Sequence, residues 1–232
     1  VDSATLSAAD FLFDGQGTPQ IFTLSGDADN FTGGAGNDIF DYIGANSQLD
    51  ASVDDLDGGT GIDVLRVFGG DRVLGPARVD ALTGIEVIDL TNVTGNLAVA
   101  LDADNAVSSD TQAITVRFGS NALDLNTGGV SSASQVIADG SGTITLAAGS
   151  PGQMLTLGDS AGGTVNTGPT ATVVQGGAQG DSITGSDGDD TFGGGAGDDT
   201  LIGAGGNDNL TGGTGTNTLT GGVDTDRFVI ST

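Results

Sequence analysis

Large apolar side chains recur every nine residues through the C-terminal part of the chain. Residues 176–229 divide without gaps into six nonapeptides: GGAQGDSIT, GSDGDDTFG, GGAGDDTLI, GAGGNDNLT, GGTGTNTLT and GGVDTDRFV. Position eight is always Ile, Leu or Phe, whereas the first six positions are rich in Gly and Asp. One large apolar residue in a three-residue run fits a short strand with one inward side chain, and the Gly-rich stretch before it fits a turn. The pattern predicts short strands that alternate with turns.

A single nonapeptide cannot bury its own apolar residue, so the units are expected to stack. Two units form a coil of 18 residues, and successive parallel coils lie about 4.8 Å apart. Position-six residues then form two columns: Asp181, Asp199 and Asn217 in one, and Asp190, Asp208 and Asp226 in the other. Stacked carboxylates at this separation repel one another by roughly 3 kcal/mol at an effective dielectric constant of about 20. A cation between them would reverse the sign of that interaction.

Further copies of the nonapeptide stand alone nearer the start of the chain. They are residues 33–41 (GGAGNDIFD) and 58–66 (GGTGIDVLR), and residues 24–32 (LSGDADNFT) form a degraded copy ahead of them. These units follow the pattern G-G-x-G-x-D-x-U-x, where U is a large apolar residue. On these residues the chain resembles the RTX family of secreted bacterial proteins. The resemblance implies an all-β fold, a right-handed parallel β-roll or β-solenoid built on calcium-binding repeats.

The resemblance also implies how Ca²⁺ is held. Position-six side chains of two stacked coils and backbone carbonyls of positions one, three and five are the expected ligands, and position-five residues act chiefly through their backbone. Calcium takes six to eight oxygen ligands in flexible geometry, which suits such turns. About four ions are expected in the C-terminal roll, bound more weakly at its end, where Asn217 has lost a charge and Asp224 replaces a Gly. The expected metal-site residues are Asp29, Gly33, Asp38, Gly58, Asp63, Gly176, Asp181, Gly185, Asp187, Asp189, Asp190, Gly194, Asp198, Asp199, Gly203, Asn207, Asp208, Gly212, Asn217 and Asp226.

The middle of the chain lacks nonapeptides but keeps short apolar runs bounded by turn residues. These runs are IEVIDL (85–90), LAVAL (97–101), ITVRF (114–118), QVIA (135–138), TITLA (143–147), MLTL (154–157) and TVV (172–174). They fit rungs of an irregular parallel solenoid, which we favour, or an antiparallel β-sandwich. Residues 76–83 are the best candidate for a helix, with Pro first and Gly84 as its C-cap. GIEVIDLT (84–91) resembles a segment found between repeats in RTX-containing bacterial surface-layer proteins.

Three sections follow from these patterns. Residues 1–66 form an N-terminal segment with isolated repeats, residues 67–175 form the irregular solenoid or sandwich, and residues 176–232 form the tandem roll. No run approaches the 18 apolar residues of a transmembrane helix.

Composition narrows the chemistry. The chain has 232 residues and a net charge of −26, from 31 acidic and five basic side chains, and Glu86 is its one glutamate. Cys, His, Lys and Trp are absent, which excludes catalytic triads with His, thiol nucleophiles and zinc sites of Cys or His. Metal ligation must therefore use oxygen. So acidic a chain is also a poor partner for nucleic acid and for anionic membranes.

The residues favour a non-enzymatic role. We expect a secreted calcium-binding structural protein, extracellular or at a bacterial cell surface, that folds and self-assembles on calcium binding into a surface layer or filament. Its expected partners are copies of itself and cell-surface polysaccharide, with no nucleic acid and no membrane insertion. The alternative is a non-catalytic RTX module of a larger secreted adhesin, protease, lipase or toxin. A calcium-dependent polysaccharide lyase or epimerase is a lesser alternative, with Arg66, Arg72, Arg78 and Arg117 as the residues to examine, although these arginines are expected to pair with aspartates.

Overall fold

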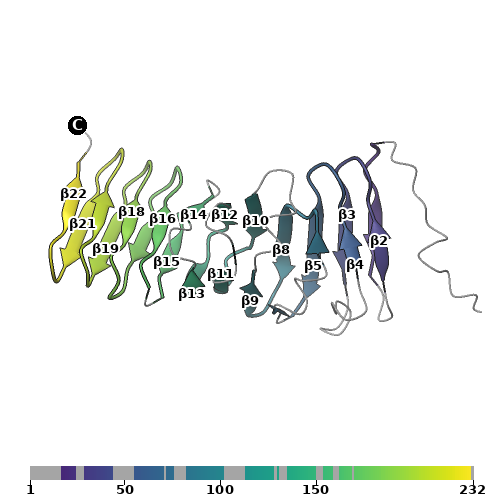
Figure 1. The fold of residues 1–232 in the computed structure, drawn as a ribbon, viewed down its shortest axis with the longest axis horizontal. Coiled ribbons are helices and arrows are strands. Elements are labelled where there is room, and N and C mark those ends of the chain that lie inside the picture. The colour runs from purple at the N-terminus through teal and green to yellow at the C-terminus, as the bar shows by residue number, and fades with distance from the viewer. Residues whose placement is uncertain are drawn as a thin grey trace, which may run out of the picture.

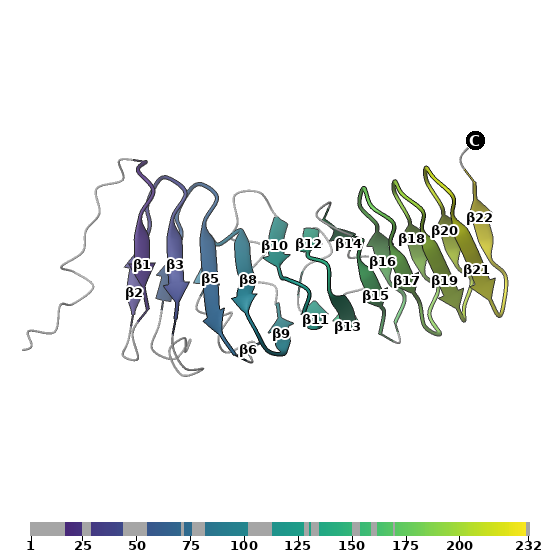
Figure 2. The same ribbon diagram turned by 180° about the vertical axis from the view of Figure 1, so that it is seen from behind.

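The protein is an elongated solenoid whose coils stack along one axis (Figure 1). The computed structural model describes residues 17–24, 29–43, 55–70, 72–75, 82–101, 113–127, 130, 135–149, 154–158, 162–168 and 170–230. Every pairing between its strands is parallel, with the strands of successive coils side by side. The described N-terminal strands lie at one end of the stack and β22 lies at the other, as the view from behind also shows (Figure 2).

One wall of the solenoid is a single sheet of 11 strands that runs from end to end. In spatial order it contains β1 (Ile21–Thr23), β3 (Ile39–Tyr42), β5 (Val64–Gly69), β8 (Val87–Val93), β10 (Ala113–Arg117), β12 (Gln135–Asp139), β14 (Met154–Leu157), β16 (Val173–Gln175), β18 (Thr191–Gly193), β20 (Asn209–Thr211) and β22 (Arg227–Val229).

Two shorter sheets complete the coils. The first contains β2 (Asn30–Thr32), β4 (Asp55–Asp57) and β7 (Leu82–Thr83). The second contains β6 (Arg72–Leu74), β9 (Leu97–Ala100), β11 (Leu123–Thr127), β13 (Thr143–Gly149), β15 (Thr164–Asn166), β17 (Ser182–Thr184), β19 (Thr200–Ala204) and β21 (Thr218–Gly222).

Coil length separates the regular roll from the rest. In the roll, Thr191 pairs with Asn209 and Asn209 with Arg227, so each coil takes the 18 residues predicted from two nonapeptides. Near the start, Ile39 pairs with Val64 and Val64 with Val87, which makes those coils 25 and 23 residues long. The pairing of the wall stays parallel through these longer coils, with one register shift between β5 and β8 after Arg66.

A continuous apolar core fills the space between the walls. Strands β17 to β20 of the roll each bury one large side chain, and Ile183, Phe192, Leu201 and Leu210 are at most 1 % exposed. At the N-terminal end the rings of Phe22 and Phe40 stack at 4.9 Å between centroids. Neighbouring residues of a strand point to opposite faces. In β17 to β20 the buried apolar residue therefore faces the core, while the residues on either side of it face outward.

The structure decides between the two architectures left open for the middle. All predicted runs there form strands, and their parallel pairing makes the section a solenoid rather than a sandwich. Strands β6, β11 and β15 were not predicted. The helix expected over residues 76–83 is wrong at its end, because Leu82 and Thr83 pair with β4, while residues 76–81 lie outside the described part. The described residues contain no helix, so none that could span a membrane.

Candidate metal centre

The last four nonapeptides of the roll share a left-handed turn conformation that depends mainly on glycine. In the third and fifth nonapeptides, positions two and four are glycines with φ near +100°: Gly195 (94°), Gly197 (110°), Gly213 (83°) and Gly215 (111°). The isolated repeats use the same positions, with Gly34 and Gly36, and Gly59 and Gly61, all at positive φ. The described part has two non-glycine residues at positive φ, Ala204 and Asp224, and they occupy positions two and four of their own units. In these units the sequence pattern is therefore a pattern of left-handed backbone positions, whereas the first two nonapeptides of the roll have no residue at positive φ.

Position-six aspartates join successive coils through their side chains. Oδ1 of Asp199 accepts a hydrogen bond from the Asp181 backbone N–H at 2.8 Å, 18 residues earlier. Oδ1 of Asp208 accepts one from the Asp190 N–H at 2.8 Å in the second column. The columns continue through Asn217 and Asp226, whose side-chain oxygens accept the N–H groups of Asp199 and Asp208. The column members predicted from the 18-residue spacing thus lie together.

The second carboxylate oxygen of these aspartates points into a narrow space at position one of the turn. A Cβ built on Gly194 would collide with Asp199 Oδ2 and lie 2.5 Å from Gly212 O on the next coil. A Cβ built on Gly203 would collide with Asp208 Oδ2 and lie 2.8 Å from Gly221 O. We call this arrangement the oxygen cradle: a position-six Oδ2 and the position-one carbonyl of the next coil, converging where glycine leaves room.

Some cradle oxygens are buried without a donor. Oδ2 of Asp38, Asp199 and Asp208 has no hydrogen-bond partner within the described part of the chain, and these three side chains are at most 1 % exposed as residues. An ionised carboxylate oxygen that lacks water and a donor is costly to bury. A divalent cation with a preference for oxygen removes that cost, so the cradle fits Ca²⁺ in its donor chemistry.

Burial also changes the acidity of the column. It raises the pKa of Asp190 to about 6, against opposing hydrogen bonds from the Thr172 and Ser186 N–H groups, and the Asp208 charge adds to the rise. Burial likewise raises the pKa of Asp199 and of Asp208, and the Asp226 charge contributes to the latter. Column neighbours therefore repel each other when ionised, as expected for stacked carboxylates without a cation.

Position-five residues form a second ladder that runs the other way. The Asn207 N–H donates to Asp189 Oδ1 at 2.7 Å, and the Thr216 N–H donates to Asp198 Oδ1 at 2.7 Å. Asn37 Oδ1 accepts the Ile62 N–H at 3.0 Å in the isolated repeats. Sequence reasoning assigned these positions a role through the backbone, and did not foresee that their side chains bind the backbone of the following coil.

The predicted site residues are distributed over two regions. The expected residues from Gly176 to Asp226 line the roll, where Asp187, Asp189 and Asp198 are exposed and the aspartates of position six are buried except Asp226, which is half-buried. Asp29, Gly33, Asp38, Gly58 and Asp63 lie at the other end of the solenoid, and their three aspartates are buried. Direct clusters of three or more acidic side chains close enough to share a metal do not occur among the described residues. Carbonyl oxygens would have to complete any site, and the role of each residue as a ligand stays a prediction.

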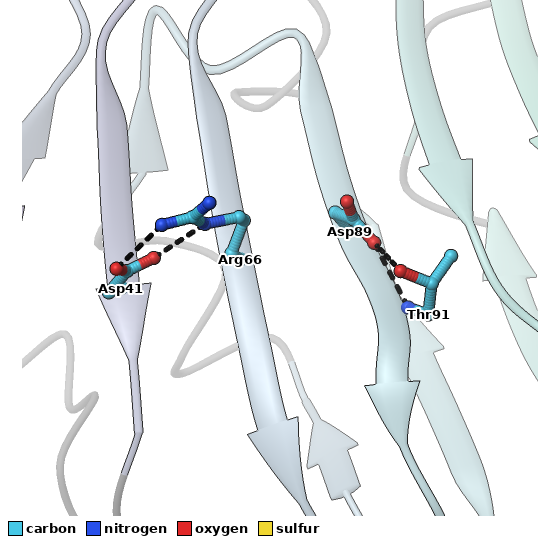
Figure 3. Close-up of polar contacts among 4 residues, drawn as sticks. All are labelled: Asp41, Arg66, Asp89 and Thr91. Carbon is cyan, nitrogen blue, oxygen red and sulfur yellow. Dashed lines mark hydrogen bonds and ion pairs between the residues drawn. The ribbon is translucent and has the colours of Figure 1, made fainter. Parts of the chain in front are cut away.

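The arginines are engaged elsewhere. Arg66 binds Asp41 through two hydrogen bonds of 2.7 Å, and Thr91 donates twice to nearby Asp89 (Figure 3). The hydrogen bonds and charge of Asp41 raise the pKa of Arg66 despite its partial burial. Arg117 lies 3.9 Å from Asp139. Arg72 is buried, donates to the Phe68 carbonyl and lies over the Tyr42 ring.

The expected pairing of arginines with aspartates is confirmed for Arg66 and Arg117. Arg78 falls outside the described residues.

Comparison with known proteins agrees with the turn geometry. Residues 21–42, 167–201 and 202–229 match the family model of the RTX calcium-binding nonapeptide repeat, in four copies. The matched stretches cover less than half of the chain and leave out the isolated repeat at residues 58–66, although its turn has the same left-handed glycines. No curated protein and no solved structure was found to match the chain.

Proposed function

Because the chain carries RTX calcium-binding nonapeptide repeats, we propose that it is a non-catalytic structural segment of a secreted bacterial protein. In this proposal the segment folds on binding calcium, about four ions in the roll, and assembles with copies of itself into a surface layer or extracellular filament. The observation that carries the folding step is the column of buried position-six carboxylates, with Oδ2 of Asp199 and Asp208 lacking a donor.

The negative charge of the chain makes its folding depend on bound calcium in this proposal. At −26 the chain repels itself, and the columns concentrate part of that charge in buried positions. A bound calcium ion would supply the positive charge that these carboxylates lack. Position-six Oδ2 and position-one carbonyl oxygens would hold it, and the glycines of position one leave the space. Folding would then follow the calcium concentration, which is low inside cells and high outside them.

Exposed apolar surface at the C-terminal end supports the assembly step. Phe228 is 47 % exposed and Ile230 is 78 % exposed, and with Leu219 they line a hollow of about 360 Å³. The outermost strands, β21 and β22, have no strand beyond them among the described residues, so their backbone groups can pair with another strand. At the opposite end, β1 is the edge strand of the long sheet among the described residues, and Ile21 on it is exposed. Contacts between unlike ends of identical molecules generate filaments when they do not close into rings.

The exposed apolar residues at the C-terminal end also fit a second candidate function, that of a module within a larger protein. A further coil of a longer chain would cover Phe228 and Ile230 as well as a second copy would, which is the arrangement expected for a module of a larger secreted adhesin, protease, lipase or toxin.

Sedimentation velocity with 5 mM calcium, or with EGTA, distinguishes self-assembly from a module of a larger protein. This calcium concentration is in about the millimolar range at which weak extracellular calcium sites fill. Surface-layer or filament assembly predicts large species of the chain with calcium and monomers without it. The variant Phe228→Ser, Ile230→Ser should stay monomeric with calcium. The matched control Ile43→Ser, Ile62→Ser, which changes two exposed isoleucines elsewhere, should assemble like the unaltered chain.

Two results would count against the proposal. A calcium-bound monomer at every concentration would remove the assembly step and leave the module reading. A circular dichroism spectrum that EGTA does not change would remove the folding step.

A further inference from the structure

A third column of buried carboxylates lies at the N-terminal end, in the coils that contain the isolated repeats. Asp38 and Asp63 are 0 % exposed and Glu86 is 4 % exposed. Asp63 Oδ1 accepts the Asp38 N–H at 2.6 Å, and Glu86 Oε2 accepts the Asp63 N–H at 2.8 Å. Glu86 thus takes the place that the next position-six aspartate holds in the roll, although its residues do not follow the nonapeptide pattern.

A shortened turn explains why this place holds the one glutamate of the protein. Strand pairing sets Asp57 beside Thr83 and Val64 beside Val87, so Gly84 is the counterpart of Gly58 and Glu86 that of Asp63. Four residues separate Gly58 from Asp63, whereas Ile85 alone separates Gly84 from Glu86. The third coil therefore makes the turn with three fewer residues. A side chain one methylene longer than Asp still reaches the Asp63 N–H.

The N-terminal column has the same oxygen cradles as the roll. A Cβ built on Gly33 would collide with Asp38 Oδ2 and lie 2.6 Å from Gly58 O. A Cβ built on Gly58 would lie 2.6 Å from Asp63 Oδ2 and collide with Gly84 O, the carbonyl of the shortened turn. Asp38 Oδ2 is buried with no hydrogen-bond partner and points into the first of these cradles. This orphaned oxygen indicates a cation rather than a self-contained acidic cluster.

At its outer end the column closes with a neutral residue. The Gln20 N–H donates to Asp38 Oδ1 at 2.8 Å, and its side-chain Nε2 donates to Gly33 O at 3.3 Å. An amide donor therefore satisfies the position-one carbonyl there, and the negative charge is confined to Asp38, Asp63 and Glu86. Arg66, on the strand that follows Asp63, is bound to Asp41 through two hydrogen bonds.

We propose that Asp38, Asp63 and Glu86 form a separate calcium-binding column at the N-terminal end, in which Glu86 supplies the last acidic ligand and Gly84 its carbonyl. The inference rests on the calcium-binding function proposed above and extends it to a residue outside the nonapeptide pattern and outside the matched segments. Calcium would thereby tie three coils of unequal length at one end of the solenoid, independently of the roll.

Tyr42 allows this column to be observed by itself. It is the one tyrosine of a chain without Trp, and it lies on β3, four residues beyond Asp38 and about 13 Å along an extended strand. From β3 to β18 in the roll there are seven strand spacings, or about 34 Å. Emission of Tb³⁺ excited through tyrosine falls steeply with distance, so it reports the N-terminal column. Tb³⁺ titrations of the full chain, followed by displacement with calcium, measure its affinity.

We expect tyrosine-sensitised emission from the unaltered chain and at least a tenfold higher half-saturating Tb³⁺ concentration for Glu86→Gln. The amide oxygen of that variant still accepts the Asp63 N–H, so the backbone contact survives while the charge is lost. Asp124→Asn, which removes one exposed charge on β11, should titrate like the unaltered chain. Should Glu86→Gln fail to fold, Glu86→Asp decides, because it keeps the charge but is too short for the turn and should also weaken binding tenfold.

Equal titrations for the unaltered chain and for the folded Glu86 variant would overturn the proposal. Asp208→Asn separates this failure from failure of the proposed function. It should reduce the total calcium bound in equilibrium dialysis and leave the tyrosine-sensitised signal unchanged. If Asp208→Asn lowers total calcium and Glu86→Gln changes nothing, the roll binds calcium and the N-terminal column does not. If no form of the chain binds calcium, both proposals fail.

Discussion

An amide in place of a column aspartate changes what the turn can bind. Asn217 Nδ2 donates to Gly213 O at 3.4 Å in its own turn, and Gln20 Nε2 donates to Gly33 O at 3.3 Å. Asn217 Oδ1 still accepts the backbone N–H of its column neighbour Asp199. The backbone N–H of Gln20 donates to its column neighbour Asp38. The amide nitrogen donates to a backbone carbonyl of the turn, at position two beside Asn217 and at position one beside Gln20, which a carboxylate cannot do. An amide in the column therefore satisfies a backbone carbonyl of the turn without a cation and lowers the negative charge that a cation would balance.

Ala204 offers a direct test of the left-handed positions. Its φ is 83°, at position two of its unit, where four of the other five units of the roll have glycine. A left-handed conformation costs a non-glycine residue roughly 1–2 kcal/mol, whereas glycine costs about 0.5–1 kcal/mol in lost chain entropy. Ala204→Gly should therefore stabilise the calcium-loaded protein by about 0.5–1 kcal/mol, measured by thermal unfolding. Ala178→Gly is the control, because Ala178 has no positive φ and the same change should destabilise there. Equal effects at both positions would contradict the argument.

The raised pKa of Asp190 predicts an unusual response to pH. Burial raises it from 3.8 to about 6, so the folded, calcium-free chain binds a proton more tightly than the unfolded chain does. Stability without calcium should then increase as pH falls from about 7 towards 4 and level off below the unfolded value. Calcium needs the ionised form, so its affinity should weaken over the same interval. Melting temperatures at several pH values, with EGTA or with calcium, measure both trends. A calcium-free protein that loses stability steadily between pH 7 and 4 would refute the first.

At the scale of strands, sequence reasoning worked where the repeat is regular. Units of nine residues determine an 18-residue coil, and the column Asp181, Asp199, Asn217 followed directly from that spacing. In the middle the coils differ in length, so no fixed spacing indicates which residues meet. Strand β15 (TVN) has one apolar residue, and β11 (LDLNT) alternates Leu with polar residues. Neither contains the short apolar run from which the other strands of the middle were predicted.

Glu86 was missed for a related reason. The shortened turn removes the glycines that identify a repeat, so residues 83–88 do not read as a nonapeptide. A signal was nevertheless present, because TGIEVI (83–88) repeats TGIDVL (60–65) with Glu for Asp. Strand register then places Glu86 beside Asp63, which spacing alone could not do because the coil is 23 residues long.

Charges of alternating sign join successive strands of the long sheet from β3 to β12. Register places Asp41 beside Arg66, Arg66 beside Asp89, Asp89 beside Arg117 and Arg117 beside Asp139 on successive strands of the long sheet. Cross-strand pairs of opposite charge contribute about 0.2–1 kcal/mol each, which is small beside the apolar core. This ladder nonetheless relates neighbouring coils without any metal, and it runs from the isolated repeats into the section where nonapeptides are absent.

On the scale of the whole molecule, two kinds of coil share one sheet. The roll has strands of three to five residues, with buried carboxylates in its turns. The middle has strands of up to seven residues, more inward apolar side chains per strand and the ladder of Asp and Arg. In a solenoid each coil contacts its neighbours alone, so stability is close to a sum of local terms and can differ from one section to another.

Hydrogen exchange should therefore reveal a graded response to calcium removal. On addition of EGTA to the full chain, amides of β17 to β21 should lose at least a hundredfold of their protection, because the buried Oδ2 atoms of Asp199 and Asp208 then have neither a cation nor, in the described part of the chain, a hydrogen-bond donor. Amides of β8 to β14 should keep most of theirs, since their core and charge ladder require no cation. Replacing calcium with magnesium should give nearly the EGTA pattern, because magnesium prefers a tighter octahedral site. Simultaneous loss of protection in both sections would show that the long sheet couples them into one cooperative unit, and local addition of coil stabilities would then be the wrong description.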